Sequence, residues 1–448
     1  MAVKIVLIGA GSAQFGYDML GDIFQSKALA GCHVELYDIN AEALAIVEKN
    51  GRRFLEEQQL PFTLTATTDR KQALQKANFC IISIEVGDRF KLMEQDWRIP
   101  LQFGIRQSMG ENGGPGGLFH SLRIIPPILE ICEDIRNICP DALVFNFSNP
   151  MSRICTTVHR RFPELKLVGL CHEIESLGQH LPLILDTPWE NLKTRAGGLN
   201  HFSILIEATY VDSGRDAYPD IRKKAPQHYK NLPKLRDVIR ELRGMEAGST
   251  PGSEPAFRAG AGEWSERGIF KALLEQYGYM PITTDSHLGE YIAWANDAAD
   301  HKGILDFYQY YLEYLDKAPQ IELKLHERAV PIMDGILTDS GYEEAAVNLP
   351  NDNLIAALPA FMAVEVPAII DKNGVTGVRL DNYPAGFAGH LCNQVGVHNL
   401  TAEAVLNQSK ELALQALLVD PTVAKYASAI DLFRYMLVIQ EPYLRYLK

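Results

Sequence analysis

A buried strand that runs directly into a glycine-containing turn and then a helix is the feature that most constrains the fold of this chain. Residues 4–8 are apolar enough for a short buried strand, Gly9 and Gly11 mark a tight turn, and residues 15–28 carry apolar side chains at helical spacing. The alternation continues, with further buried strands expected at 33–37, 62–66, 77–84, 142–147 and 165–170. Because helical patterns lie between most of these strands, we expect an α/β fold with a Rossmann-like, doubly wound parallel sheet.

The chain is too long for a single compact core. At 448 residues it is expected to form two closely joined domains. The strand–helix alternation stops near residue 195, after which residues 202–211 alternate like an antiparallel strand and helical patterns dominate. We therefore predict a Rossmann-like domain at 1–195 and an α+β, mostly helical domain at 196–448 that provides substrate and subunit contacts.

Composition and charge exclude several classes of function. The net charge of −13 disfavours binding to nucleic acid, because phosphate contacts require a basic surface. No run of 18 apolar residues and no signal peptide is evident, so we expect a cytoplasmic protein without a membrane span. The seven scattered cysteines lack C-x-x-C pairs and are expected to be reduced thiols. We also expect a homo-oligomer, a dimer or a tetramer; the apolar segment 430–446 fits either a core helix or its contact surface.

The first turn has the composition of a dinucleotide-binding site. A pyrophosphate needs backbone N–H groups at a helix N-terminus and glycines that let the main chain come close, which fits Gly9, Gly11 and Ser12. The third glycine of the G-x-G-x-x-G pattern is replaced by Gln14, so the motif alone is weak. Asp38, at the end of the second strand, can bind both adenosine ribose hydroxyls and would repel the 2′-phosphate of NADP. Together these residues predict NAD+ as the cofactor, with an ordinary α/β turn as the alternative.

Three polar clusters lie in the middle of the chain. The glycine-rich run at 109–117 can approach a ligand closely, and Asn149 follows a buried strand at the sheet edge where ligands bind in open α/β folds. Cys171 follows the next strand and precedes His201 by 30 residues, so a thiolate and an imidazole can share a divalent metal. Such residues are more often packed in the core, and two ligands do not complete a structural zinc site. An open coordination sphere would suit a catalytic metal that also binds substrate oxygens.

In this order, the motifs resemble glycoside hydrolase family 4, the NAD- and manganese-dependent glycosidases. The resemblance spans residues 1 to about 300 and rests on the turn at 9–12, Asp38, the loop at 113–117, Asn149-Pro150, Cys171-His172 and Asn200-His201. It implies NAD+ and Mn²⁺ as cofactors and a redox-assisted elimination, an exception to the two-carboxylate chemistry of most glycosidases. In that reaction hydride leaves C3 of the sugar, a base removes the C2 proton, the aglycone leaves C1, water adds and the hydride returns. The net reaction is hydrolysis.

The resemblance also assigns roles to individual side chains. It implies that Cys171 and His201 bind the metal and that Asn149 holds sugar hydroxyls. His172 stands where the phospho-α-glucosidases of the family have an aspartic acid that serves as the acid. We expect His172 to take this role, because histidine can donate a proton near neutral pH.

In the family, the base comes from a later segment. The matching stretch here is 279–291, in which we favour Asp285, with His287 and Tyr291 as rivals. Glu111 resembles an acidic residue that supports the base in other members. The catalytic set implied by the resemblance is therefore His172, Asp285 and Glu111.

The tetrapeptide that begins at the ligand cysteine varies with the substrate in this family. The stretch Cys-His-Glu-Ile at 171–174 resembles the Cys-His-Glu-Val of the α-galacturonidases, and Met93 stands where phosphosugar enzymes carry an arginine. The implied substrate is a uronic acid glycoside, an α-galacturonide from small pectin fragments. Its carboxylate needs a cation, ideally a bidentate arginine, and the candidates are Arg89, Arg106 and Arg153.

Other functions remain open from the sequence. Within the family they are α-glucuronidase and α-galactosidase or α-glucosidase. A malate-type NAD-dependent dehydrogenase shares the first domain, but it would need no metal and would release NADH stoichiometrically. A non-catalytic NAD sensor would have no use for a metal at Cys171 and His201.

Overall fold

Six parallel strands form one half of a continuous sheet. They are β1 (Lys4–Ile8), β2 (His33–Tyr37), β3 (Thr63–Thr67), β4 (Phe79–Ile82), β5 (Leu143–Asn146) and β6 (Leu167–Gly169). Their order, β3-β2-β1-β4-β5-β6, is the doubly wound order of dinucleotide-binding folds. The computed structural model describes residues 3–12, 15–232, 267–315 and 319–448, so Gln14 lies outside the described residues.

The sequences of these strands are nearly continuous apolar runs, because helices cover both faces of the parallel half of the sheet. Val6 and Ile8 of β1 belong to the core formed with α5 (Gly114–Ile138) and α6 (Met151–Arg161). Ile5 and Leu7 point to the opposite face and pack in the core that contains α1 and α2. The remaining helices of this half are α1 (Phe15–Gln25), α2 (Ala41–Gln58), α3 (Arg70–Leu74) and α4 (Arg89–Gln102).

The sheet continues beyond β6 through antiparallel strands. These are β7 (Leu192–Leu199), β8 (Phe202–Tyr210), β9 (Tyr342–Pro350), β10 (Ala363–Asp371) and β11 (Gly374–Gly377). They extend the order as β6-β9-β10-β7-β8, with β11 paired to β10. The predicted antiparallel strand at 202–211 is β8, whereas β9 and β10 were not predicted. The expected domain boundary at 195/196 falls inside β7.

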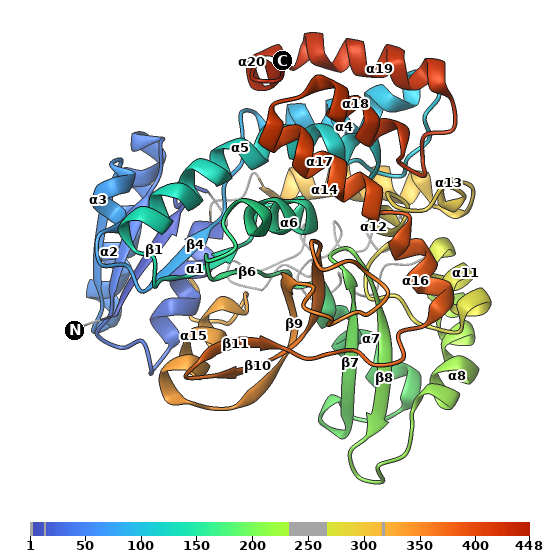
Figure 1. Cartoon of the computed structure of the whole chain (residues 1–448). Helices are drawn as coiled ribbons and strands as arrows, with labels where there is room; N and C mark the ends of the chain where they lie inside the picture. The colour runs from blue at the N-terminus through green and yellow to red at the C-terminus, as the bar shows by residue number, and fades with distance from the viewer. Residues whose placement is uncertain (1–2, 13–14, 233–266, 316–318) are drawn as a thin grey trace.

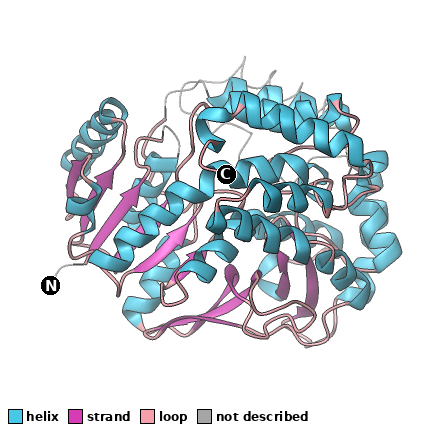
Figure 2. Ribbon diagram, turned by 45° about the horizontal axis from the view of Figure 1, so that its top comes forward, coloured by secondary structure: helices cyan, strands magenta, loops and turns pink. Residues whose placement is uncertain are grey.

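Helices dominate the rest of the chain, as expected (Figure 2). They include α7 (Ser176–Leu185), α8 (Tyr218–Asn231), α11 (Gly268–Tyr277), α12 (Asp285–Leu288), α13 (Ala295–Ala298), α14 (His301–Leu315), α15 (Ala329–Thr338) and α16 (Ala385–Cys392). The last four are α17 (Val395–Asn407), α18 (Lys410–Leu418), α19 (Tyr426–Ile439) and α20 (Glu441–Leu444). Side chains of these last helices enter the core around α5 and α6, so the C-terminus returns to the parallel half (Figure 1).

The fold class predicted from the sequence is confirmed, namely a Rossmann-like parallel sheet followed by a mixed, largely helical second half. Most boundaries shift by one to three residues; α1, for example, ends at Gln25 and does not continue to residue 28. Among the described residues, no helix is both long and apolar enough to cross a membrane.

Candidate active site

The turn after β1 depends on two glycines. Gly9 has φ +92°, and a Cβ there would lie 2.0 Å from the carbonyl oxygen of Ser83. Gly11 donates its N–H to Asp38 Oδ2 at 2.8 Å, and a Cβ on Gly11 would lie 2.8 Å from that same oxygen. The N–H of Ser12 donates back to Gly9 O at 3.2 Å. The turn therefore brings bare main chain to the start of α1, as a bound pyrophosphate requires.

Gly16 makes the close contact that the third glycine of the usual pattern provides. A Cβ at Gly16, on α1, would lie 2.6 Å from the carbonyl oxygen of Ala10. The third glycine of the pattern allows a helix to pack closely against the strand end. The departure at Gln14 is thus compensated two residues later in the sequence.

Asp38 closes β2 and is tied to the glycine turn. Its Oδ2 accepts the N–H of Gly11 and its Oδ1 accepts the N–H of Asn40, both at 2.8 Å. A carboxylate has about four acceptor positions, so each oxygen keeps capacity for a ribose hydroxyl. The side chain is partly exposed, and a ligand in the turn can reach it.

Side chains from separate segments meet at the turn between β7 and β8. Cys171 Sγ lies 3.5 Å from His201 Nε2, so the two predicted metal ligands are neighbours in the fold. Ligand atoms of Glu111, His201 and His287 all lie within 4.8 Å of one another. Glu173 Oε1 lies 3.6 Å from His201 Nε2 and 3.4 Å from His287 Nε2. We call these five residues the His201 cluster; its thiol, imidazoles and carboxylates fit a divalent transition metal.

The backbone of His201 is strained. Its φ of +61° lies in the left-handed region, which residues other than glycine rarely adopt. The preceding Asn200 donates its side-chain amide to Glu365 Oε2 at 2.8 Å, and Glu365 also accepts from Ser203 Oγ at 2.8 Å. Strain of this kind persists only where the surroundings hold it, and it gathers at functional sites. The turn is therefore built to present the imidazole of His201.

Burial controls the protonation of the two predicted metal ligands. Burial and the neighbouring His287 lower the pKa of His201 well below its usual value. The imidazole is therefore neutral, the form that can bind a metal. Burial and the carboxylate of Glu173 raise the pKa of the Cys171 thiol well above its usual value. A coordinated cation would remove that proton, because metals deprotonate the thiols that bind them.

His172 lies at the exposed rim of the cluster. Its Nδ1 lies 3.5 Å from Glu327 Oε1, and its side chain is largely exposed. The carboxylate of Glu327 raises the pKa of His172 to about 9, so the imidazolium is the main form at neutral pH. A protonated histidine that solvent can reach, directly after a predicted metal ligand, suits proton donation to a leaving group.

The structure turns Asp285, our preferred base, toward a neighbouring helix. Its Oδ2 accepts the N–H of Ile269 and its Oδ1 accepts the N–H of Phe270, both at 3.0 Å, at the start of α11. Burial raises the pKa of this carboxyl to about 6. By contrast, the rival Tyr291 lies against the strained turn, with its hydroxyl 3.4 Å from Asn200 O. Asp285 is therefore not brought into the His201 cluster, and it has a structural task as a helix cap.

We expect replacement of Asp285 by alanine to lower the free energy of unfolding by about 1–2 kcal/mol, because two helical N–H groups lose their acceptor. Urea unfolding of the variant and the parent protein measures the difference. Replacement of Asp69, which caps α3 in the same way on the surface, is a matched control with a smaller expected effect. An unchanged unfolding free energy for the Asp285 variant would contradict the capping role.

Several buried polar atoms of the cluster, of the strained turn and of the segment after β5 have no hydrogen-bond partner within the described part of the chain. They are Asn149 Oδ1, Glu173 Oε2, Asn200 Oδ1 and His287 Nδ1. Leaving a buried polar atom unpaired costs about 1–3 kcal/mol, so such atoms are rare unless a ligand satisfies them. Their position fits a cation together with a ligand rich in hydroxyl groups.

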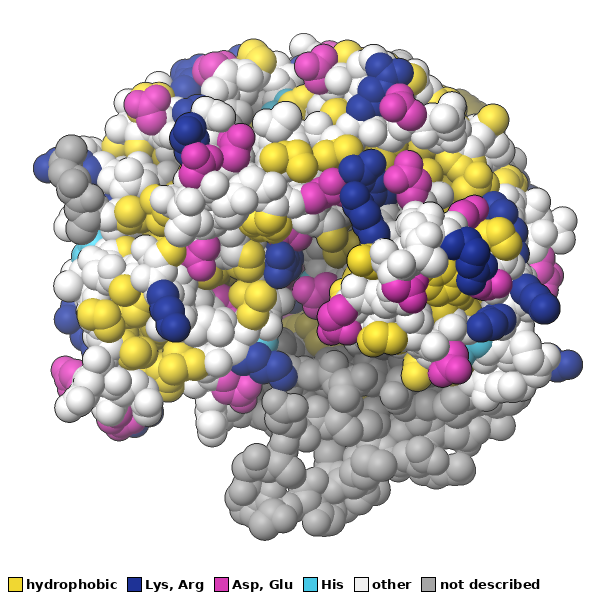
Figure 3. All heavy atoms as spheres, turned by 90° about the horizontal axis from the view of Figure 1, so that it is seen from below, with side chains coloured by type: hydrophobic (Ala, Val, Ile, Leu, Met, Phe, Trp, Pro, Cys, Tyr) yellow, Lys and Arg dark blue, Asp and Glu magenta, His cyan; other side chains and the backbone are white. Residues whose placement is uncertain are grey.

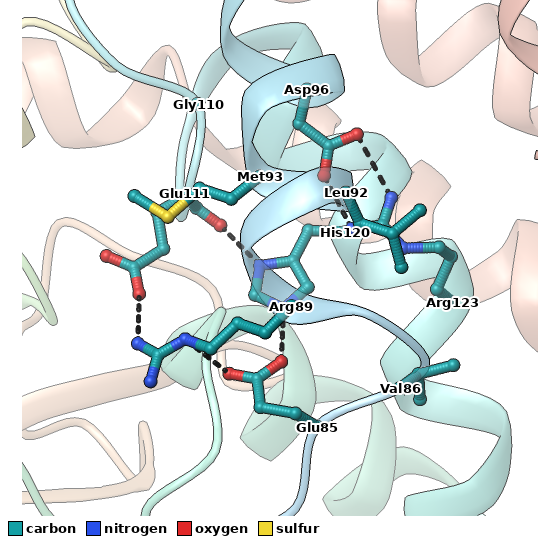
Figure 4. A pocket seen from close by; sticks show the side chains of 10 residues that line it. All are labelled: Glu85, Val86, Arg89, Leu92, Met93, Asp96, Gly110, Glu111, His120 and Arg123. Atoms are coloured by element: carbon teal, nitrogen blue, oxygen red, sulfur yellow. Dashed lines mark hydrogen bonds and ion pairs between the residues drawn. The ribbon is translucent and has the colours of Figure 1, made fainter. Parts of the chain in front are cut away.

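A small cavity of about 20 Å³, room for about one water molecule, lies beside Glu111. Its wall includes Met93 and three cations, and each cation has a carboxylate partner (Figure 4). The side-chain pairs and their separations are Arg89–Glu85 at 3.4 Å, Arg89–Glu111 at 3.9 Å, His120–Glu85 at 3.6 Å and Arg123–Asp96 at 2.5 Å. Among the described residues that line the cavity, both arginines and His120 therefore have a carboxylate partner. Viewed from below, the molecular surface is hollowed near its centre, with acidic and basic side chains at the rim (Figure 3).

Sequence reasoning gave no site role to Glu173, Asn112 or Glu290. Glu173 was visible in the tetrapeptide at 171–174, but only as an indicator of the substrate. Asn112 places its amide 2.7 Å from His201 Nδ1, and Glu290 binds the backbone of the loop that carries Asn112. The glycine-rich run at 109–117 was the only signal for these contacts, since contacts to backbone N–H groups leave no pattern in residue type.

Comparison with known proteins places the chain in a family. The model of the family 4 glycosyl hydrolases matches residues 4–186, and that of their C-terminal domain matches residues 196–423. The chain belongs to glycosyl hydrolase family 4. An α-glucosidase from Erwinia rhapontici is 58% identical over the full length of both chains. An α-galacturonidase from Thermoanaerobacter italicus is 28% identical, covering 99% of this chain and 97% of its own.

Solved structures agree with this assignment. A 6-phospho-α-glucosidase from gut microorganisms, solved with NAD and Mn²⁺, superposes with a TM-score of 0.76, at 19% identity and 99% coverage of both chains. Malate dehydrogenase from Cryptosporidium parvum reaches a TM-score of only 0.52 at 15% identity, covering 91% of this chain and 100% of its own. It therefore shares only the fold with this chain. Membership of family 4 identifies the chain as a glycosidase, and the dehydrogenase and sensor alternatives are set aside.

Proposed function

We propose that this family 4 glycosidase hydrolyses neutral α-glucosides, with NAD+ and Mn²⁺ as cofactors. The observation that carries the choice of a neutral sugar is the pairing of the basic side chains beside Glu111: among the described residues there, Arg89, His120 and Arg123 each have a carboxylate partner. The Erwinia rhapontici relative, named an α-glucosidase, supports the same choice. The solved relative with NAD and Mn²⁺ supports the cofactors.

The residues present fit both cofactors. Gly9, Gly11 and Asp38 would hold NAD+, and Cys171 and His201 would hold Mn²⁺. When bound, NAD+ supplies a hydride acceptor for C3 of the sugar and Mn²⁺ supplies positive charge for O2 and O3.

The protein's own groups then orient the sugar and move its protons. Asn149 would bind sugar hydroxyls through its unpaired Oδ1, and His172 would protonate the leaving oxygen. We propose that the base which takes the C2 proton comes from His287 or Tyr291, with Glu111 in support, because these residues border the strained turn. Asp285 would serve mainly as a cap of α11.

An α-galacturonide is the second candidate, favoured by the Cys-His-Glu-Ile stretch at 171–174. Its weakness is that two of the three arginines considered, Arg89 and Arg106, are already paired with carboxylates. Arg89 already contacts Glu85 and Glu111. Arg106 is paired with Asp297 at 2.8 Å. Arg153 is buried 4.0 Å from Asp420, and its guanidinium nitrogens have no hydrogen-bond partner among the described residues. A phosphosugar is also disfavoured. Met93, which stands where phosphosugar enzymes carry an arginine, lines the cavity and offers no cation for a phosphate.

Purified enzyme with NAD+, Mn²⁺ and a thiol should cleave p-nitrophenyl α-glucoside at least about tenfold faster, by kcat/KM, than the α-galacturonide. A factor of ten corresponds to the loss of one charge-assisted hydrogen bond from a uronate that finds no cation. NAD+ should act catalytically, without net absorbance at 340 nm. Preference for the α-galacturonide would overturn the choice of sugar but leave the cofactor assignment intact, whereas stoichiometric NADH would overturn both.

Replacement of Asp38 by alanine should weaken NAD+ binding about tenfold or more and narrow the preference over NADP+. The reason is the loss of a charged acceptor for the ribose and of the hydrogen bond that holds Gly11. Equilibrium titration by protein fluorescence measures both affinities. Asp69→Ala removes the acid after the neighbouring strand β3 and should leave NAD+ affinity unchanged. Equal losses in both variants would argue against a direct role for Asp38.

The remaining assignments stay proposals. We propose that residues 1–195 bind NAD+ and that 196–448 supply substrate and subunit contacts. Tyr426 and Val438 of α19 are 72% and 74% exposed, an apolar surface compatible with the homo-oligomer expected from the sequence. The cytoplasmic location rests on composition alone.

A further inference from the structure

The loop before α5 is fastened by one buried carboxylate. Glu290 Oε1 accepts the N–H of Glu111 at 2.7 Å, and its Oε2 accepts those of Asn112 and Gly113 at 2.9 and 2.8 Å. Glu290 itself is completely buried. Three successive N–H groups on one carboxylate form a rigid, charge-assisted arrangement. The loop position of Asn112 is therefore fixed independently of its own side chain.

The side chain of Asn112 uses this fixed position to touch His201. Its amide nitrogen Nδ2 lies 2.7 Å from His201 Nδ1, its Oδ1 has no hydrogen-bond partner among the described residues, and both residues are buried. On the other side of the same ring, His201 Nε2 faces Cys171 Sγ at 3.5 Å. A neutral imidazole carries one proton, so Nε2 can bind a metal only when the proton is on Nδ1. A half-turn of the amide places the oxygen of Asn112 on that proton, since only an oxygen can accept it.

We propose that Asn112, anchored through Glu290, is the positioning residue that makes His201 a metal ligand. It accepts the Nδ1 proton and leaves Nε2 free toward Cys171. Partners of this kind orient a ligand imidazole, and their loss typically weakens metal binding about 10- to 100-fold. The inference rests on the metal site in the proposed function, and it goes further by assigning a residue outside that ligand pair.

Two substitutions of similar size separate the hydrogen bond from the packing. Asn112→Leu keeps much of the volume but has no acceptor, and we expect Mn²⁺ affinity to fall about 10- to 100-fold. Asn112→Asp keeps an acceptor for the Nδ1 proton and should retain most of the affinity. Mn²⁺ binding is measured without NAD+ or sugar, by electron paramagnetic resonance of the free ion, so activity is not the readout. If Asn112→Leu fails to fold, Asn112→Ala replaces it.

Controls distinguish failure of this inference from failure of the metal site. Cys171→Ser should weaken Mn²⁺ binding; if it does not, the site in the proposed function is wrong. If Cys171→Ser weakens binding but Asn112→Leu does not, only the positioning role is overturned. Asn351→Leu removes another buried amide, one that donates to Ile355 O and Leu358 O, and should leave Mn²⁺ affinity unchanged. An equal loss in Asn351→Leu would mean a general effect of destabilisation.

The anchor predicts one further result. Glu290→Gln replaces one accepting oxygen by an NH₂ group, which cannot accept an N–H of the loop. We expect Mn²⁺ affinity to fall in this variant as well, although the hydrogen bonds that the Glu290 carboxylate accepts come from the loop at 111–113 and not from Cys171 or His201. Unchanged affinity in folded Glu290→Gln would remove Glu290 from the proposal.

Discussion

Replacing Cys171 by serine is expected to lower kcat/KM for an α-glucoside by about a thousandfold or more, together with the loss of tight Mn²⁺ binding. A thiol bound to a cation is deprotonated and supplies negative charge, whereas a serine hydroxyl in the same buried place stays neutral. Removing a single neutral hydrogen-bond donor that stabilises a developing oxyanion already costs about 10² to 10³ in rate. The loss of a cation that, in the proposed function, stabilises charge on O2 and O3 should cost at least as much.

The measurement is a steady-state assay over a series of Mn²⁺ concentrations. If serine acts by weakening the metal, saturating Mn²⁺ should restore part of the activity and the unfolding transition should stay close to that of the parent. Cys392→Ser is the matched control, because Cys392 is an exposed cysteine on α16. It should retain full activity. Full activity of Cys171→Ser at low Mn²⁺ would remove Cys171 from the metal site.

The parallel half of the fold was predictable because each strand there is a short apolar run between helical patterns. The antiparallel half was not. In β7, Lys193, Arg195 and a pair of glycines interrupt any apolar alternation, and β7 is read as a strand only when paired with β8. Strand β10 is buried on both faces and so lacks the alternation that marks a half-buried strand. Tertiary pairing decides these segments.

The candidate site shows the same division. The motifs that carry side-chain chemistry, Cys171 and His201, were identified from sequence and lie together. The direction of Asp285 was not, because its position in the 279–291 stretch cannot reveal that the carboxylate caps a different helix. Glu290 also escaped notice, because its partners are backbone N–H groups of a distant loop. Sequence patterns reveal which chemical groups are available, whereas long-range packing decides where each side chain points.

At His201, in the strained turn, substitutions should change activity and unfolding free energy independently of each other. His201→Asn should lower kcat/KM by about a thousandfold or more, since the amide cannot replace a neutral imidazole as a metal ligand. Its stability should change little, because asparagine tolerates the left-handed region that φ +61° requires. The Mn²⁺ affinity of the variant should fall in parallel with its activity.

His201→Val provides the matched comparison. A β-branched residue is a clear outlier at positive φ, so this variant should lose about 1–2 kcal/mol of unfolding free energy more than His201→Asn. Urea unfolding and the glucosidase assay, run on the same preparations, separate the two quantities. Both variants should be inactive, but only valine should strain the β7–β8 turn. Equal stabilities would show that the turn relaxes at little cost, and the conformation of His201 would then not be held by its surroundings.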